Sequence, residues 1–542
     1  MNKLIHKTRE LLFAKQSSIF SSAVIIAIMI VVSRLFGFLR YRILAGYFSK
    51  EELDIYFASF RIPDLIFEII ITGALISSFI PIYIKYQKDK KELSENISSI
   101  VNVLSLAMLI FIFVLYLGME AIIKVITPGF SADSIAKIII FSRLLLVGQL
   151  PFLIIGNFLT GIGQANKLFF LPALAPIVYN IAIILFTVGF ATNLGLLAPI
   201  FGVIFGAILF LFLQLPIFLK ADFKYELILK KTKGLVEFIR IMVPRAVTII
   251  VAQIDATIDL SLTSMVGAGS YTVFYLAQHL QLLPVSVVGV AFGQAALPYL
   301  SELYENNNIE EFKKIIISSI LNLFFFTIPI MSFFIFARTP LVRLFFGGQK
   351  FDWEATVQTA LTFSFFSLSL PFHSIYYFLT RCFYAFHNSR IPFMVSVLSI
   401  GVNTALSLFF ILVLKMPVWS LAISFSVAMI LNTVLLFLIL EWIFKGLDLT
   451  ILFIESFKMA AVALFSSLIT YYFMRLLDGL ILDTTRTINI FILLCLAGGL
   501  YVGLYLFLGW LINVKQLFLV SRIFLKMKEY QQRIVEIYTS YE

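Results

Sequence analysis

Three arginines stand within one apolar stretch near the start of the chain. Arg34, Arg40 and Arg42 lie in SRLFGFLRYRI, which follows directly on the apolar run SSAVIIAIMIVV, and the two stretches together predict one membrane-spanning helix. An arginine at the centre of such a helix costs roughly 2.5 to 3.5 kcal/mol to insert. We therefore expect Arg34 to face a water-filled cavity. Arg40 lies about 120° from Arg34 on an ideal helix, so a bend at Gly37 would be needed to bring it to the same side. Arg42, near the span end, can instead reach the membrane surface by snorkelling.

Guanidinium groups in a wet cavity suit an anionic ligand, because their planar forks match the oxygens of phosphate. Arg61, in the second apolar block, is expected to line the same cavity. Asp255 and Asp259 are four residues apart and so share one helix face, where a carboxylate could bind a hard cation such as sodium. Hydrogen bonding of Asp259 to neighbouring helices is the alternative.

Motifs of enzymes and nucleotide-driven transporters are missing from the sequence. There is no GxxxxGK[ST] phosphate loop, no metal-spaced Cys/His set and no serine-nucleophile elbow. We therefore expect no enzyme activity and no cofactor. Transport would be driven by a sodium gradient, by the membrane potential or by the substrate gradient itself.

Composition places these residues in a polytopic membrane protein. The chain is 61% hydrophobic and only 13% charged, against about 25% charged residues in soluble domains. Apolar blocks long enough to cross a hydrocarbon core of roughly 30 Å recur along it. About fourteen spans are predicted, centred near residues 30, 72, 110, 148, 180, 207, 250, 285, 324, 370, 402, 430, 463 and 499.

Lysines are distributed unevenly between the predicted loops. The loops near 85–91 and 220–233 are rich in lysine, whereas TPGFSAD, ATNLG and VGAGS hold no Lys or Arg. The positive-inside rule therefore predicts that both termini are cytoplasmic. The basic residues report topology, so no nucleic-acid partner is expected. The tail, 513–542, alternates basic and apolar residues and is predicted to lie as an amphipathic helix on the cytoplasmic membrane surface.

An internal repeat divides the predicted spans into halves. ALISSFIPIY and AFGQAALPYL place an aliphatic residue and a proline at the same distance from an alanine, and Leu-Thr pairs at 159–160 and 379–380 each precede a proline. The pattern predicts an all-α membrane protein with two six-helix lobes as parallel repeats, residues 1–220 and 234–443. An extra helix pair is predicted at 450–512.

Over nearly its whole length, the sequence resembles the MurJ family of lipid II flippases, also called MviN. The resemblance is carried by motifs in a characteristic order: SRLFGFLR, DIYFASFRIPDL, GALISSFIPIY, TPGF, PALAPIVYNI and LTRCFYAFHNSRIPF. It implies a fourteen-helix fold whose last helix pair forms a groove for a lipid tail. It also implies export of the undecaprenyl-diphosphate-linked peptidoglycan precursor, lipid II, across the bacterial cytoplasmic membrane by alternating access. A monomer is expected.

The resemblance also implies roles for individual residues. Arg34, Arg40 and Arg61 match basic residues of the family's substrate cavity, and Asp54 matches its acidic residue at the start of span two. In the second half, Asp259 matches an aspartate associated with sodium. Asn403 is the polar partner that matches in span eleven, and His279 in span eight is a substrate-binding candidate that donates an extra bond only when protonated.

Three positions depart from the family pattern. Tyr41 stands where an acid is usual, while Phe67 and His279 stand where arginines are usual. The anion-binding set is therefore thinner, which leaves open a flippase for another polyprenyl-diphosphate-linked oligosaccharide. A drug/cation antiporter of the same multidrug/oligosaccharidyl-lipid/polysaccharide exporter superfamily is a further alternative, although it would be expected to have an acidic cavity and twelve spans.

Overall fold

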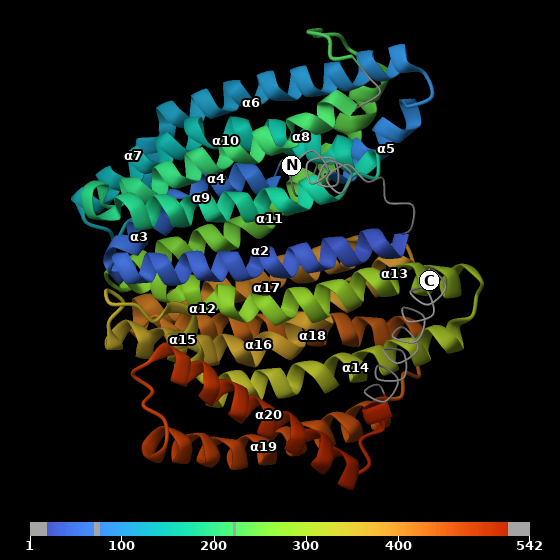
Figure 1. The fold of residues 1–542 in the computed structure, drawn as a ribbon. Helices are drawn as coiled ribbons and strands as arrows, with labels where there is room; N and C mark the ends of the chain where they lie inside the picture. Colours follow the sequence, from blue (N-terminus) through green and yellow to red (C-terminus); the bar gives the residue numbers. More distant parts are fainter. Residues whose placement is uncertain (1–18, 70–75, 221–223, 519–542) are drawn as a thin grey trace, which may run out of the picture. The chain divides into compact units, whose positions relative to one another are not determined.

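The computed structural model describes residues 19–69, 76–220 and 224–518. The basic segment before residue 19 and most of the predicted tail 513–542 lie outside these ranges. Every described regular element is a helix, and the described ranges contain no strand. The predicted all-α fold is therefore confirmed (Figure 1).

The chain packs into two compact units. The first unit comprises residues 1–273 and 345–355, and the second comprises residues 274–344 and 356–542. The predicted lobes, 1–220 and 234–443, rest on the sequence repeat rather than on packing, and they stay a prediction.

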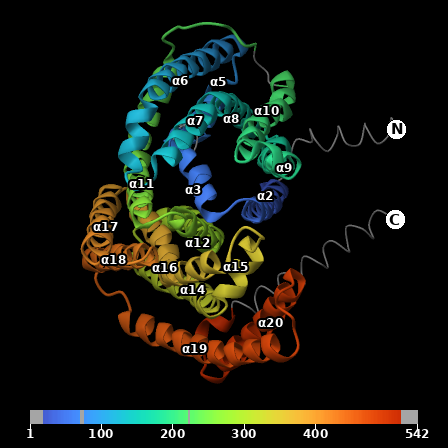
Figure 2. The ribbon, with the colours of Figure 1, turned by 90° about the vertical axis from the view of Figure 1, so that its left-hand side faces the viewer.

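The helices of the first unit follow one another with short connections. In chain order they are α2 (Ile19–Tyr47), α3 (Lys50–Ser59), α4 (Arg61–Phe67), α5 (Ile76–Tyr86), α6 (Lys90–Ile126), α7 (Ala132–Gly148), α8 (Leu150–Ala165), α9 (Phe170–Leu194), α10 (Leu197–Lys220) and α11 (Lys233–Val266). Helix α9 packs against both α2 and α10, while α11 packs against α6. Figure 2 shows α9 beside α10 when the helices are seen from their ends.

The second unit holds the remaining helices. They are α12 (Ser270–Pro284), η2 (Val285–Val290), α13 (Ala291–Glu305), α14 (Ile309–Phe336), α15 (Arg338–Phe346), α16 (Trp353–Ala385), α17 (Arg390–Leu408), η3 (Phe409–Val413), α18 (Trp419–Phe444), α19 (Leu449–Leu480), α20 (Thr487–Leu511) and η4 (Lys515–Leu517). The first turn of α12, the end of α15 and the start of α16 belong to the first unit. The last two long helices, α19 and α20, pack as a pair (Figure 2). This pair corresponds to the predicted extra helices at 450–512.

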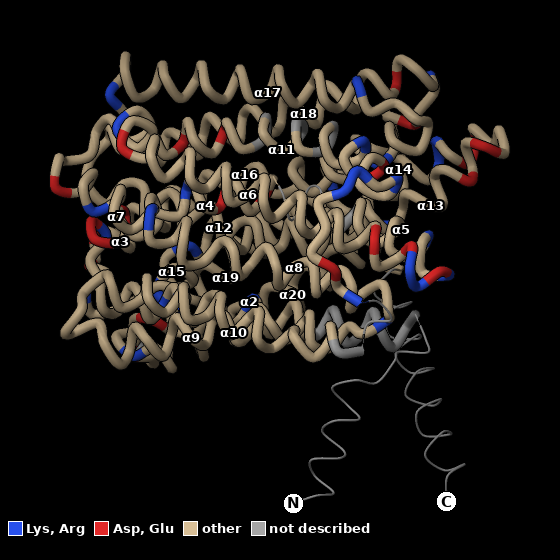
Figure 3. The backbone as a smooth tube through the Cα atoms, turned by 90° about the horizontal axis from the view of Figure 1, so that it is seen from above, with Lys and Arg blue, Asp and Glu red and all other residues tan. Residues whose placement is uncertain are grey.

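The helices carry an apolar exterior, as a bilayer requires. Large side chains such as Phe453, Phe457 and Trp442 are 76 to 80% exposed, which water would penalise and lipid tails would not. Figure 3 shows that Lys, Arg, Asp and Glu gather mostly near helix ends. Ten helical segments of the described chain are long and apolar enough to cross a membrane.

The predicted total of about fourteen spans stays a prediction. The span near residue 72 falls partly on residues 70–75, outside the described ranges. The spans near residues 30, 250 and 370 lie in α2, α11 and α16, helices of 29, 34 and 33 residues that are not among the ten.

Residues 224–232 form a non-helical connection that runs along α6, and polar side chains of α6 bind its backbone. Ser94 and Ser98 accept hydrogen bonds from the amides of Lys224 and Glu226, both at 3.0 Å. The Asn102 amide group donates to the carbonyls of Glu226 and Ile228, at 2.9 and 3.0 Å. The connection therefore has partners for its backbone without belonging to a sheet.

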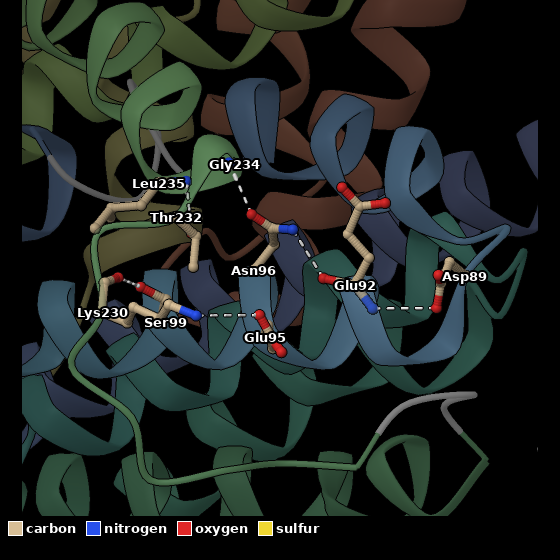
Figure 4. A network of polar contacts seen from close by, with 9 residues as sticks. All are labelled: Asp89, Glu92, Glu95, Asn96, Ser99, Lys230, Thr232, Gly234 and Leu235. Carbon is tan, nitrogen blue, oxygen red and sulfur yellow. Dashed lines mark hydrogen bonds and ion pairs between the residues drawn. The ribbon is translucent and has the colours of Figure 1, made fainter.

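The same contacts continue to the start of α11. Ser99 donates to the carbonyl of Lys230, and Asn96 accepts a 2.7 Å bond from the amide of Gly234 (Figure 4). Thr232 caps α11 by accepting from the amide of Leu235 at 3.2 Å. Because Asn96 is buried, these bonds fix where α11 begins relative to α6.

Candidate functional site

The arginines of α2 have different surroundings. Arg34 is exposed, whereas Arg40 is half-buried. The Arg40 guanidinium carbon lies 4.8 Å from the ring centre of Tyr41, a cation-π distance. Tyr41 therefore contacts the cation through its ring where the family pattern has an acid, and the positive charge of Arg40 is not neutralised by this contact.

Arg61 bridges α4 to α11. Its Nε donates to the Thr257 hydroxyl at 3.0 Å. Its Nη2 donates both to the Gln253 carbonyl at 2.7 Å and to the Gln253 side-chain oxygen at 2.6 Å. Arg61 is 9% exposed. All three acceptors are neutral, so the bonds hold the guanidinium in place while leaving its charge uncompensated by them.

The partners of Arg61 were not predicted from the sequence. Gln253 and Thr257 are four residues apart, as are Asp255 and Asp259. The two pairs lie about 160° apart around an ideal helix, so α11 presents polar groups on two faces. The alternating polar residues in AQIDATID are the signal that could have indicated this second polar face.

Asp54 is buried, with 3% of its surface exposed. One carboxylate oxygen accepts from the Gly269 amide at 2.6 Å, and the other accepts from the Thr272 amide at 2.7 Å. The Thr272 hydroxyl in turn donates to the Lys50 carbonyl at 2.9 Å. Asp54 therefore holds the first turn of α12, where unpaired amides favour a negative charge. Its predicted contact with substrate stays a prediction.

Phe67 belongs to the apolar packing of the first unit. It lies against a cluster formed by Leu153 of α8, Ala175 of α9, and Ala207 and Phe210 of α10. An arginine in place of Phe67 would lie against this apolar cluster. The phenylalanine, which differs from the family pattern, therefore suits its apolar neighbours.

The remaining predicted site residues are distributed between the two units. His279, in the second unit, is half-buried, and its Nδ1 lies 2.8 Å from the Tyr275 carbonyl. Asp259 is 5% exposed in α11 of the first unit, and Asn403 is 3% exposed in α17 of the second. Within the described residues, no group of three or more His, Cys, Asp or Glu could hold a metal ion. The sodium site and the role of His279 stay predictions.

Comparison with known proteins gives one consistent family. A family model described as lipid II flippase MurJ matches residues 43–489. A probable lipid II flippase MurJ of Buchnera aphidicola subsp. Schizaphis graminum (strain Sg) is 27% identical over 508 residues, which cover 91% of this chain and 97% of that protein. A lipid II flippase MurJ of Thermosipho africanus (strain TCF52B) is 28% identical over 395 residues, covering 72% and 80%.

Two solved structures resemble this chain, one of the same family and one of the same fold. A lipid II flippase MurJ in an inward closed conformation matches with a TM-score of 0.74 at 25% identity, covering 90% of this chain and 100% of that one. An inward-facing multidrug resistance MATE family transporter matches with a TM-score of 0.66 at 13% identity, covering 79% and 99%. The second likeness is one of fold alone.

Proposed function

We propose, since the chain belongs to the MurJ family of lipid II flippases, that it moves lipid II across the bacterial cytoplasmic membrane by alternating access. The transported molecule is an undecaprenyl-diphosphate-linked peptidoglycan precursor, whose diphosphate is the part that a hydrocarbon core excludes most strongly. The task of the protein is to keep that charge compensated. No covalent bond is made or broken.

The arginines of α2 are the observation that carries this proposal. Arg34 and Arg40 sit in a helix whose other residues are overwhelmingly apolar, and Arg34 is exposed. Exposed positive charge at membrane depth is costly unless it meets water or an anion. A diphosphate supplies several acceptor oxygens, and each charge-assisted hydrogen bond to one contributes roughly 1.5 to 3 kcal/mol.

Arg61 supports the same role in a different way. Its bonds to Gln253 and Thr257 restrict the guanidinium to one position, and restriction before binding lowers the entropy lost when an anion docks. We propose that Arg61 supplies a fixed positive charge, whereas the exposed Arg34 supplies an adaptable one. Asp54 would act by holding the start of α12 rather than by contacting the lipid.

Coupling is proposed to involve a monovalent cation or the membrane potential. Asp259 and Asn403 are the proposed sodium ligands, because a carboxylate and an amide oxygen suit a hard cation. The protein is proposed to act as a monomer with both termini in the cytoplasm. A drug/cation antiporter is supported only by likeness of fold, whereas a related lipid-linked oligosaccharide remains the alternative substrate.

Depletion of the protein in its own cell tests this function. We expect lipid II to accumulate and to become inaccessible to an impermeant enzyme that cleaves its diphosphate from outside. Accumulation of a different polyprenyl-linked sugar, with lipid II still accessible, would assign the alternative substrate. Unchanged levels of every lipid-linked sugar would contradict a flippase function altogether.

A further inference from the structure

The first unit holds a basic pocket that is not lined by Arg34, Arg40 or Arg61. Its volume is about 700 Å³, and its lining comes from the end of α2, the end of α9 and residues 347–350. Arg42 and Lys350 contribute two cations, and the lining includes no Asp or Glu. This volume falls within the range of small-ligand sites, roughly 300 to 1,000 Å³, and exceeds what a single phosphate ion needs.

The loop that carries Lys350 is fixed against α2. The ring of Phe345 lies 4.8 Å from that of Phe38, and the ring of Phe346 lies 6.4 Å from that of Tyr41. Gly348 approaches so closely that a Cβ atom there would stand 2.6 Å from the carbonyl oxygen of Ala45. The loop therefore sits directly on the α2 backbone, and this contact sets the position of Lys350.

The far end of the same loop is also held. Lys50 pairs with Glu354 at 3.5 Å, and the Asp352 carboxylate accepts a 2.7 Å bond from the Ala355 amide. Glu354 is thereby paired with a cation of α3. The lining of the pocket is therefore net positive. The segment that carries Lys350 contacts α2 at its start and α3 at its end.

The lining combines apolar and cationic residues. Leu39 and Ile43 are apolar, and Leu39 is 44% exposed. Thr192 and Gln349 add polar groups beside the two cations. An inorganic anion would contact only the polar and cationic residues of the lining, whereas an amphiphile would also contact the apolar ones.

The predicted topology makes two cations here unusual. Ala191 and Thr192 line the pocket, and they belong to ATNLG, one of the loops without Lys or Arg that are predicted to face outward. Positive residues are depleted on that side. The positive-inside rule therefore does not favour Arg42 and Lys350 at this pocket, and a bound anion would compensate the charge of both.

We propose that this pocket binds the phosphate-bearing headgroup of a lipid in the outer leaflet, with the phosphate between Arg42 and Lys350 and the start of the tail along Leu39 and Ile43. From the sequence alone, Arg42 is expected only to reach the membrane surface, without a ligand. The proposal rests on the predicted orientation but not on transport, so a binding measurement tests it separately from the proposed function.

The test uses the full-length protein in detergent, with Cys495→Ser and Thr192→Cys to place an environment-sensitive dye at the pocket. Cys382 is buried and should not react. Undecaprenyl diphosphate, phosphatidylglycerol and inorganic diphosphate are titrated in separate arms. We expect the lipids to bind more tightly than inorganic diphosphate, and the tighter of the two lipids identifies the source of the headgroup.

The key comparison is between two double variants that each remove two positive charges. Arg42→Gln/Lys350→Gln should weaken lipid binding by about tenfold to a hundredfold, because it deletes two charge-assisted donors. The control, Lys124→Gln/Lys137→Gln, removes two exposed cations that pair with Glu120 and Asp133 one turn away. The control should bind within about twofold of the parent.

Two outcomes would overturn the proposal. Equal lipid affinity in the two double variants would remove the role of Arg42 and Lys350, and inorganic diphosphate binding as tightly as the lipids would exclude a lipid-specific site. Lys350→Gln alone changes an exposed side chain and should not disturb folding. Weaker lipid binding by this single variant would therefore not be due to misfolding. Native mass spectrometry of the unlabelled protein, counting retained phosphatidylglycerol, repeats the comparison without the dye.

Discussion

Arg34 and Arg61 both lie in segments predicted to cross the membrane, yet their surroundings in the structure differ. Arg34 is exposed on α2, whereas Arg61 is 9% exposed and donates three hydrogen bonds to α11. The insertion cost that singles out both residues is the same. The difference teaches that such a residue can be retained for a ligand, for a helix contact, or for both.

Removal of Arg61 should have the largest effect. Arg61→Ala deletes a fixed charge and also separates α4 from Gln253 and Thr257, so we expect loss of transport together with a lower free energy of unfolding, by about 1–3 kcal/mol. Growth of flippase-depleted cells measures the first, and thermal unfolding in detergent measures the second. Gln253→Ala/Thr257→Val is the matched control, which should lower stability but retain more transport. Equal transport loss in the control would make Arg61 purely structural.

Arg34→Ala should impair ligand binding without weakening the packing of helices. An exposed side chain contributes little to packing, so stability should change by less than about 0.5 kcal/mol. Transport should fall by about tenfold to a hundredfold if the residue binds diphosphate. Arg34→Lys should restore only part of the activity, because an ammonium keeps the charge but loses the planar fork. Full activity of Arg34→Ala, with expression verified, would argue against the anion-binding role of α2.

These two residues also show how far sequence reasoning reaches. The helical class follows from long apolar runs, and the arginines stand out against them because a charge in a bilayer is costly. The partners of Arg61 could not be predicted, since Gln253 is 192 positions away and the helix pairing that joins them is a property of the fold. The loop contact that builds the Arg42 and Lys350 pocket depends in the same way on Gly348 approaching α2.

Tyr41 and Phe67 differ from the family pattern, and the structure shows what each of them contacts. Tyr41 lies beside the Arg40 guanidinium, and Phe67 packs against an apolar cluster. The contact of Phe67 joins α4 to α8, α9 and α10, and nothing in the sequence around Phe67 indicated it.

Asp259 allows a test of coupling that is independent of the arginines. Asp259→Ala should reduce transport and remove any dependence on sodium, because it deletes a hard oxygen ligand. Sodium-dependent transport in proteoliposomes is the measurement. An alanine variant with the parent's activity and sodium response would place the cation site elsewhere.

A smaller effect is expected at Asp54. Asp54→Ala leaves the amides of Gly269 and Thr272 without their acceptor, and loss of a helix-capping carboxylate typically costs about 0.5–2 kcal/mol. Thermal unfolding should therefore show a lower midpoint, while Asp54→Asn, which keeps one oxygen acceptor, should fall between the two. Weaker lipid II binding at unchanged stability would instead assign Asp54 to the substrate.

The smallest effect is expected from cysteines that report topology. Cysteine at Thr192 or Ser131 should react with an impermeant thiol reagent in intact cells, whereas cysteine at Lys90 or Lys231 should be protected, with transport unchanged in each case. Labelling at Lys231 from outside would reverse the orientation, and would move the Arg42 and Lys350 pocket to the inner leaflet.

The central claim is that α2 arginines carry the diphosphate of lipid II across the membrane. Its most direct test is purified protein in proteoliposomes loaded with lipid II, with an impermeant enzyme added outside to cleave whatever lipid II becomes accessible. The account predicts that the parent protein makes internal lipid II accessible and that Arg34→Ala and Arg40→Ala do so far more slowly. Rates for Arg34→Ala and Arg40→Ala equal to the rate of the parent, with all three above protein-free vesicles, would contradict it.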